Sequence, residues 1–331
     1  MLRKSIILFL AAGLMLLSSC KIRDSYDHCG VYLEFIFDHN MDYEDTFVSE
    51  ISDVDVYVFD GKGRFLFTRH AECAGLTDGK KMWLNDMEFN TYKILVVGGM
   101  CEHFSLASHD GGELVPGEHD IQHARLALRR LAAETDKEFP HIWFGEKTVE
   151  IDYSADQSVW PVRLVRNTNK FKVELSRRDK SSDPGTRSSA PYTFEIVAPE
   201  GAVYDCDNNP SIREKVVYKT YDLNTGGSGG AISVGRLNTM RLFDDDPDGY
   251  QLIVRKTSTG EKMWEFDLME FLRKRKPASR PDGSTLPMQE YLDREWNWEL
   301  NILYDLDDDS AFMAVAIVVN GWIIWLNEIE A

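Results

Sequence analysis

This chain of 331 residues has no excess of positive charge. Its 37 lysine and arginine residues are outnumbered by 55 aspartate and glutamate residues, and the formal net charge is −18. No long stripe of basic residues interrupts that balance, and a field this negative repels a phosphate backbone. We therefore expect no nucleic-acid partner. Hydrophobic residues still make up 43% of the chain, which is enough for a folded core and argues against wholesale disorder.

The sequence also lacks motifs that mark common catalytic and redox sites. It has no Cys-x-x-Cys pair, which excludes zinc-ribbon and thioredoxin-like sites, and no Gly-x-x-x-x-Gly-Lys phosphate loop. No constellation of acid and base residues indicates a catalytic cleft. We accordingly predict that the protein is not an enzyme and uses no cofactor.

Long hydrophobic runs are absent apart from Ile6–Leu17, which follows the basic residues Arg3 and Lys4. This run of twelve residues is shorter than the about 20 that a membrane-spanning helix needs. Its length and its positive flank are typical of a secretory signal. Residues 1–19 are therefore predicted to be a signal peptide.

The signal ends in Leu17-Ser18-Ser19-Cys20, an apolar residue and two small residues before a cysteine, which resembles the bacterial lipobox. We expect cleavage between Ser19 and Cys20, and attachment of acyl chains such as palmitate to Cys20. Several acyl chains hold a protein firmly on a membrane, whereas a single chain does so marginally. The alternatives are a plain signal peptide with a chance cysteine, or a residual membrane anchor.

The remaining four cysteines allow three disulfide connectivities in an exported protein. They are Cys29, Cys73, Cys101 and Cys206. A Cys73–Cys101 pair is one expectation, because both residues lie in the first half of the chain. Buried free thiols are the alternative.

Strand-type alternation dominates the chain. Residues 31–37 place apolar side chains on one face, and two alternating runs flank a glycine-containing turn at residues 60–63, which predicts a hairpin. The dipeptide Asn320-Gly321 predicts a second hairpin, between Phe312–Val319 and Trp322–Leu326.

Two segments have helical spacing instead. Ile121, Ala124, Leu128 and Leu131 predict an amphipathic helix over residues 121–133, and residues 266–273 predict a short helical turn. Short strands at regular spacing with turns between them indicate β-sandwiches. We predict an all-β protein of two sandwich domains in tandem with one or two short helices, divided into residues 20–166 and 167–331.

Three groups of side chains are weak candidates for metal sites. His119 and His123 are four residues apart, with His103 and His109 nearby, but they lack the His-Glu-x-x-His pattern and are equally consistent with exposed histidines. Asp244, Asp246 and Asp248 match the first half of a calcium loop, whose closing position is Arg255 rather than a carboxylate. A second acidic group comprises Asp305, Asp307, Asp308 and Asp309. Both acidic groups also fit ordinary turns between strands, where aspartate is favoured.

Four tryptophans lie near the C-terminus: Trp296, Trp298, Trp322 and Trp325. Exposed aromatic residues on a sandwich can bind sugars. At alternating strand positions, however, tryptophan more often belongs to the core, and that is the expectation here.

Five stretches together resemble the fimbrial anchor (FimB/Mfa) family of Bacteroidota lipoproteins. They are LSSC, DVDVYVFDGKGRFL, IWFGEKTVEI, VRLVRNTNKFKVEL, and the C-terminal pair MQEYLDREWNWELNILYDL and IVVNGWIIWLNEIE. They span nearly the whole mature chain. The resemblance implies two transthyretin-like sandwich domains and a structural role in a fimbria.

The resemblance implies that the protein is an outer-membrane lipoprotein, which anchors a fimbria through the lipid on Cys20. It would join a shaft subunit by exchange of β-strands, limit shaft length, and lie on the cell surface as part of the fimbria. The segment Phe312–Leu326 is the candidate edge or donor element, or else closes its own sandwich. The alternatives are a tip or adhesin subunit, which would lose its N-terminal strand, and a surface glycan-binding lipoprotein.

Overall fold

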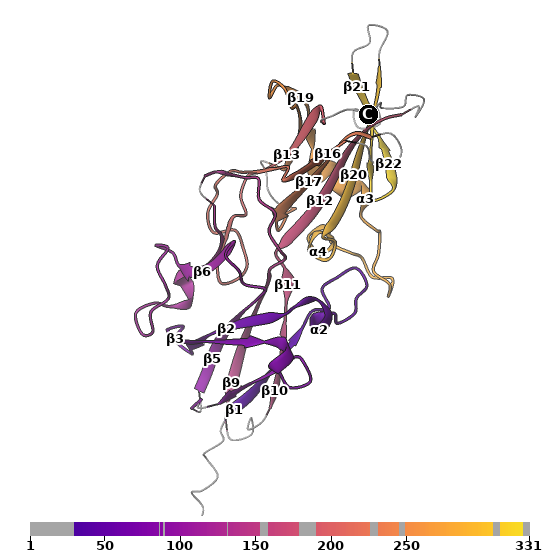
Figure 1. Cartoon of the computed structure of the whole chain (residues 1–331). Coiled ribbons are helices and arrows are strands. Elements are labelled where there is room, and N and C mark those ends of the chain that lie inside the picture. The colour runs from indigo at the N-terminus through magenta and orange to yellow at the C-terminus, as the bar shows by residue number, and fades with distance from the viewer. Residues whose placement is uncertain are drawn as a thin grey trace, which may run out of the picture.

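The computed structural model describes residues 30–85, 87–88, 90–130, 132–152, 158–178, 190–225, 231–244, 249–306 and 312–326. The described part of the chain is built mainly from strands, so the prediction of an all-β sandwich protein is confirmed. Figure 1 shows an elongated molecule with one group of sheets at each end.

Two sheets face each other at the N-terminal end and form what we call the N-terminal sandwich. The smaller sheet has the order β10-β1-β4, from β1 (Gly30–Ile36), β4 (Lys81–Asn85) and β10 (Val159–Arg163). The larger has the order β11-β9-β5-β2-β3, from β2 (Asp53–Asp60), β3 (Phe65–Glu72), β5 (Asn90–Gly98), β9 (Trp143–Ile151) and β11 (Val165–Arg166).

Strand β1 lies in the middle of its sheet, parallel to β10 and antiparallel to β4. The alternation seen in the sequence places Val31, Leu33 and Phe35 toward the larger sheet, and all three are fully buried. The first strand is therefore part of the core of the N-terminal sandwich.

The predicted hairpin around residues 60–63 is confirmed as β2 and β3. The Asp60 carboxylate accepts hydrogen bonds from the amides of Lys62 and Arg64, both at 2.9 Å. Gly63 has a φ of 87°, a left-handed conformation that glycine adopts without steric cost. Local turn chemistry thus determines where this hairpin turns.

A second pair of sheets forms the C-terminal sandwich. One sheet has the order β16-β17-β12-β20-β21-β22, from β12 (Thr168–Arg177), β16 (Asp222–Asn224), β17 (Ala231–Met240), β20 (Asn297–Leu306), β21 (Phe312–Val319) and β22 (Trp322–Trp325). The other has the order β19-β18-β13-β15-β8, from β8 (Glu134–Thr135), β13 (Tyr192–Ala198), β15 (Val216–Lys219), β18 (Gln251–Lys256) and β19 (Lys262–Asp267).

A small third sheet corrects the predicted helix over residues 121–133. The chain there forms a short 3-10 turn, Ile121–His123, and then the strand β7 (Ala124–Leu128). Ala124, Leu126 and Leu128 also alternate with period two, and this period prevails because β7 pairs with β6 (Phe104–Ser108) and β14 (Val203–Tyr204).

The small sheet joins the two halves of the molecule. Its apolar face covers the outer face of the larger N-terminal sheet, where Phe59, Leu95 and Phe144 belong to one continuous core with the C-terminal sandwich. The core between the two N-terminal sheets is a separate cluster.

The chain passes from the N-terminal sheets to the C-terminal ones at Asn167, between β11 and β12. Strand β8, however, comes before this crossing and pairs with β15, and β14 comes after it and pairs with β7. The division into residues 20–166 and 167–331 therefore stays a prediction about independently folding units.

Three short α-helices are present among the described residues: α2 (Phe47–Glu50), α3 (Leu268–Arg275) and α4 (Met288–Arg294). The predicted turn at residues 266–273 corresponds to α3, whose start is capped by the Asp267 carboxylate accepting from the Glu270 amide. Helices α2 and α4 were not predicted, because each is only one or two turns long.

The Asn320-Gly321 hairpin is also confirmed. Asn320 has a φ of 42° and Gly321 a φ of 82°, the left-handed pair that a two-residue turn between β21 and β22 requires.

Two tryptophans provide a matched test of this core. Trp298 is 0% exposed, stacks on Phe171 and donates its ring N–H to the Asn169 side chain. We expect Trp298→Ala to lower the free energy of unfolding by about 3–5 kcal/mol, because it leaves a large cavity. Trp322→Ala, at a side chain 60% exposed, is expected to change it by about 0.5 kcal/mol or less. Urea unfolding measures both, and equal losses would contradict the assignment.

Candidate functional site

The predicted lipid site cannot be placed relative to the fold. Ser19 and Cys20, like Cys29, lie outside the described residues. The first described residue, Gly30, begins β1 in the N-terminal sandwich. In Figure 1 this sandwich lies at one end of the molecule and the β21–β22 hairpin at the other. Lipidation and cleavage stay predictions from the sequence.

The β21–β22 hairpin is the candidate interaction surface. Strand β22 is the last strand of its sheet, so one of its edges pairs with β21 and the other has no strand beside it among the described residues. Trp322 is 60% and Ile323 50% exposed, and Met313 and Trp325 are exposed as well. Only Ile324 of β22 is buried. Several large apolar side chains on one edge hairpin are typical of a contact surface.

This exposure corrects the expectation that the C-terminal tryptophans belong to the core. Trp298 is buried, and Trp296 is half-buried against other side chains, but Trp322 and Trp325 are exposed. These two are three positions apart on one strand and so point to opposite sides of the sheet. They do not form the single flat platform that a sugar ring would need.

The histidine candidates do not form a metal site. The rings of His109 and His123 stack with centroids 4.8 Å apart, and His119 lies 5.9 Å from His123. The Nδ1 atoms of His119 and His123 each accept a backbone N–H, so their neutral rings carry the proton on Nε2 and offer no lone pair there. His103 contacts Phe139 instead. The described residues contain no group of three metal-ligating side chains suited to an ion.

The acidic turns are only partly described. Asp244 pairs with Arg273 at 2.9 Å, and Asp305 pairs with Arg178. Arg255 lies in β18 and pairs with Glu195. The remaining candidates lie outside the described residues: Asp246, Asp248, Asp307, Asp308 and Asp309.

The predicted Cys73–Cys101 disulfide is wrong. Both residues, and Cys206, are free thiols. Cys73 is buried in the core of the N-terminal sandwich, whereas Cys101 packs against the other core, so the larger N-terminal sheet separates them. Burial raises the pKa of Cys73 and of Cys206 to about 11, which keeps these thiols protonated and unreactive.

The fold does not support one sequence motif that is typical of hydrolases. Residues 226–230 read Gly-Gly-Ser-Gly-Gly, which fits Gly-x-Ser-x-Gly, but a nucleophile of that type sits between a strand and a helix. These residues lie outside the described ranges, and the element that follows them is the strand β17.

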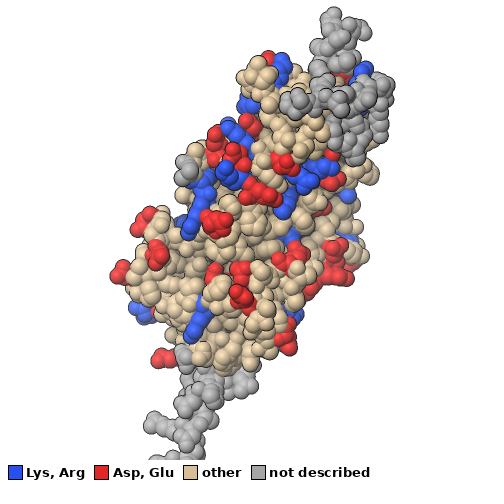
Figure 2. Space-filling model, viewed as in Figure 1, with Lys and Arg blue, Asp and Glu red and all other residues tan. Residues whose placement is uncertain are grey.

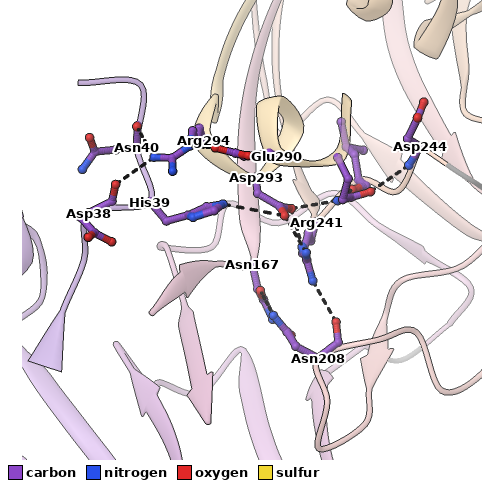
Figure 3. Close-up of polar contacts among 12 residues, drawn as sticks. Asp38, His39, Asn40, Asn167, Asn208, Arg241, Asp244, Glu290, Asp293 and Arg294 are labelled. Atoms are coloured by element: carbon purple, nitrogen blue, oxygen red, sulfur yellow. Dashed lines mark hydrogen bonds and ion pairs between the residues drawn. The ribbon is translucent and has the colours of Figure 1, made fainter. Parts of the chain in front are cut away.

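The side chains that sequence reasoning missed lie at the junction between the sandwiches. Arg241, directly after β17, makes a bidentate pair with Asp293 of α4, at 2.6 and 2.7 Å. Its remaining guanidinium nitrogen donates to the Asn208 carbonyl, and its amide donates to the Asn167 carbonyl. Asn167 and Asn208 also exchange side-chain amide hydrogen bonds. Figure 3 shows these contacts converging on Arg241.

A second arginine extends this network into the N-terminal sandwich. Arg294, also on α4, donates to the carbonyls of Asp38 and Asn40 at 2.9 and 3.0 Å, in the loop after β1 (Figure 3). It is held by Glu290, which also binds Arg280. The Arg280 and Arg294 hydrogen bonds lower the pKa of Glu290 to about 2, against the opposing effect of burial. Helix α4 is therefore tied to both sandwiches.

A third arginine, Arg166, is buried among aromatic rings. Its guanidinium carbon lies 4.5 Å from the Trp296 ring centroid and 4.9 Å from that of Phe37, and Trp143 is close by. Its ion-pair partner is Glu50. Burial lowers the pKa of Arg166 to about 10, which leaves it charged at neutral pH. We call the contacts of Arg166, Arg241 and Arg294 the junction network.

No sequence motif indicates this network, because its members are far apart in the chain and each is an ordinary arginine, asparagine or acid. Charges are otherwise mixed over the surface: Figure 2 shows acidic and basic side chains interspersed on one face. Within the described ranges, no helix combines the length and the apolar character that crossing a membrane would require.

The chain as a whole is similar to known proteins. A family model described as "Fimbrillin-A associated anchor proteins Mfa1 and Mfa2" matches residues 25–328. The minor fimbrium anchoring subunit Mfa2 of Porphyromonas gingivalis is 24% identical over 335 residues, covering 95% of this chain and 92% of that protein.

Solved structures show the same fold. A candidate adhesin from Bacteroides ovatus has a TM-score of 0.83 and 36% identity, covering 92% of this chain and 97% of its own. The fimbrial anchor protein Mfa2 of P. gingivalis has a TM-score of 0.67 and 18% identity, covering 90% and 99%.

Removing the partner of Arg241 tests the junction network. We expect Asp293→Asn to destabilise the protein by about 3–5 kcal/mol, because it leaves a buried guanidinium without a counter-charge. A matched control is Glu261→Gln, which removes an exposed pair with Lys256 and is expected to cost about 1 kcal/mol or less. Chemical unfolding measures both. A small loss of unfolding free energy in the Asp293 variant would contradict a stabilising role for the Arg241–Asp293 pair.

His141 forms a hydrogen bond between its Nδ1 atom and the Thr168 hydroxyl, and its ring packs edge-on against Trp296. We expect this buried ring to make the stability of the junction sensitive to acid. Burial and the neighbouring Arg166 lower its pKa to about 3. The unfolded chain binds a proton near pH 6.5, so stability should fall as the pH drops below 6.5 and continue to fall toward 3. His141→Gln should flatten this dependence between pH 6.5 and 4, whereas Val48→Gln, at an exposed side chain that does not titrate, should leave it unchanged. Unfolding curves across this pH range measure the slope.

Proposed function

Since the chain belongs to the family of fimbrillin-A associated anchor proteins, we propose that it anchors a fimbria to the outer membrane through lipid on Cys20. The family is one of structural proteins associated with fimbriae at the cell surface, not of enzymes. In this proposal the protein joins a shaft subunit by adding or exchanging a β-strand, and limits shaft length by ending the polymer at the membrane.

The observation that carries the proposal is the placement of the two candidate contact elements. The N-terminal sandwich contains β1, the first described strand after the predicted lipobox. This sandwich and the exposed edge hairpin β21–β22 lie at opposite ends of the molecule (Figure 1). A protein held to a membrane at one end would present its apolar edge away from the lipid. The free edge of β22 offers backbone donors and acceptors to an incoming strand, and Trp322 and Ile323 offer apolar contact area.

The junction network suits such a role for a physical reason. A tether transmits force from its membrane end to its fimbrial end, and that force has to cross the boundary between the two sandwiches at Asn167. Ion pairs and hydrogen bonds from α4 to both sandwiches add parallel connections across the same boundary.

The main alternative is a tip or adhesin subunit, and the similarity to the B. ovatus candidate adhesin favours considering it. The two roles differ in processing. Strand β1 fills the space between β10 and β4 with buried side chains, so its removal would open a groove in the N-terminal sandwich. A subunit within the polymer would lose β1, whereas an anchor would keep both β1 and Cys20.

Mass spectrometry of the N-terminal peptide from purified fimbriae separates these roles. We expect an acylated Cys20 followed by residues 21–29 and then by the sequence of β1. An N-terminus downstream of residue 36 would instead assign the protein to the shaft or tip. Failure to co-purify with any fimbria would favour the glycan-binding alternative.

The hairpin is tested by a charge placed on its surface. We expect Ile323→Glu to reduce the number of fimbriae retained on cells several-fold, because a buried carboxylate opposes an apolar contact. Val48→Glu, at a side chain that is also exposed but lies on α2, is the matched control and should retain wild-type numbers. Counting fimbriae on cells and in the medium by immunoblot gives the result, and equal retention by both variants would remove the hairpin from the proposed interface.

A further inference from the structure

A cleft of 910 Å³ lies beside strand β6, where the small sheet covers the N-terminal sandwich. All five residues of β6, Phe104–Ser108, line it. Tyr57, Phe65 and Thr68 of β2 and β3 form part of the opposite wall. The volume is in the range of binding pockets in proteins. The proposed fimbrial contact at β21–β22 makes no use of this cleft.

The cleft reaches the edge of β6 and extends over one face of the small sheet, because Arg125, Ala127 and Arg129 of the β7 segment also line it. Successive side chains of a strand point to opposite faces, so a space lined by five consecutive residues of β6 has to include the strand's edge. Strand β6 is the last strand in the order β14-β7-β6, and its only strand partner among the described residues is β7.

The backbone of β6 offers hydrogen-bonding groups to this cleft. The amides of Phe104 and Ser108 donate to Cys101 and Gly112, not to β7, and the Leu128 amide opposite Phe104 donates to Ala202. In an antiparallel pair, alternate residues point their backbone groups away from the partner strand. Leu106, midway between Phe104 and Ser108, therefore directs its N–H and C=O to the open edge, where the described residues supply no partner for either group.

The cleft is also positively charged, in contrast to the protein as a whole. Arg125 and Arg129 both line it. Arg125 donates to the carbonyls of Gln122 and Ala124, and within the described ranges neither guanidinium forms an ion pair with a carboxylate. The lining also contains His109 and a single acid, Glu113. On a chain with a net charge of −18, two arginines without acidic partners indicate a ligand that brings the negative charge.

We propose that the open edge of β6 binds an extended segment of another polypeptide, which adds as a fourth strand and carries an acidic side chain that faces Arg125 and Arg129. Backbone hydrogen bonds to Leu106 would supply affinity, and the arginines would supply register and selectivity. Because the Phe104 and Ser108 amides are already bonded within the chain, the added segment would pair with β6 at Leu106, between these two residues. An unpaired strand edge with outward N–H and C=O groups favours a peptide over a saccharide.

The experiment selects ligands for the purified full chain in detergent from a phage-displayed library of random short peptides. We expect enrichment of sequences that contain Asp or Glu and lack proline at the centre. Arg129→Ser should weaken binding of the selected peptides about tenfold, because it removes a charge-assisted contact. The matched control is Arg69→Ser, which removes an arginine of β3 that lies over Phe67, outside the cleft lining, and should leave affinity unchanged.

A test on the ligand side does not depend on whether a β6 variant folds. Synthetic versions of a selected peptide, each N-methylated at one position, should lose affinity about tenfold at alternate positions only, because only alternate amides of an added strand bond to β6. Four results would each overturn the proposal. They are no enriched peptide, equal tolerance of N-methylation at every position, equal binding to the Arg129→Ser variant, and binding of acidic alginate oligosaccharide but of no peptide. Because the assay needs neither lipid nor fimbriae, its outcome is independent of the proposed anchoring function.

Discussion

The bidentate pair between Arg241 and Asp293 is the contact on which the relation between the two halves of this protein depends. Arg241 follows the last residue of β17, and Asp293 lies on α4, which also reaches the loop after β1 through Arg294. The chain makes its last crossing from the N-terminal to the C-terminal sheets at Asn167, whose carbonyl accepts from the Arg241 amide. A buried guanidinium needs its counter-charge, so the pair keeps α4, the crossing and the loop after β1 in one arrangement.

Apolar packing supports the same arrangement. The small sheet β14-β7-β6 draws strands from both sides of the crossing and closes a core that extends from Phe59 and Leu95 of the N-terminal sandwich into the C-terminal one. Burial of this continuous surface opposes rotation of one sandwich against the other. An elongated protein that has to carry force between its ends benefits from both features. The hydrogen bonds fix the relative orientation of the two sandwiches, and the apolar packing buries surface between them.

The two candidate contact surfaces follow from edges that the sheets leave open. Among the described residues, each sandwich sheet ends in strands that pair with a neighbouring strand on one side only. At β22 the edge is apolar and exposed, whereas at β6 it lies in a cleft with two arginines. These chemistries differ enough for the two edges to accept different partners, one through buried apolar area and the other through backbone pairing with a charged side chain.

Local chemistry by itself determined the strands, the hairpins at residues 60–63 and at Asn320-Gly321, and helix α3, because turn residues, caps and apolar alternation act over a few neighbouring positions. The lipobox at Cys20 is likewise a local signal, and it remains a prediction from the sequence. Tertiary structure alone decided that residues 124–128 form a strand, that Cys73 and Cys101 lie on opposite sides of a sheet, and that Trp322 is exposed while Trp298 is buried. It also brought Arg166, Arg241 and Arg294 to one boundary. These outcomes depend on which strands pair across long stretches of chain, and a periodicity that fits both helix and strand, or a lone arginine, carries no information about its distant partners.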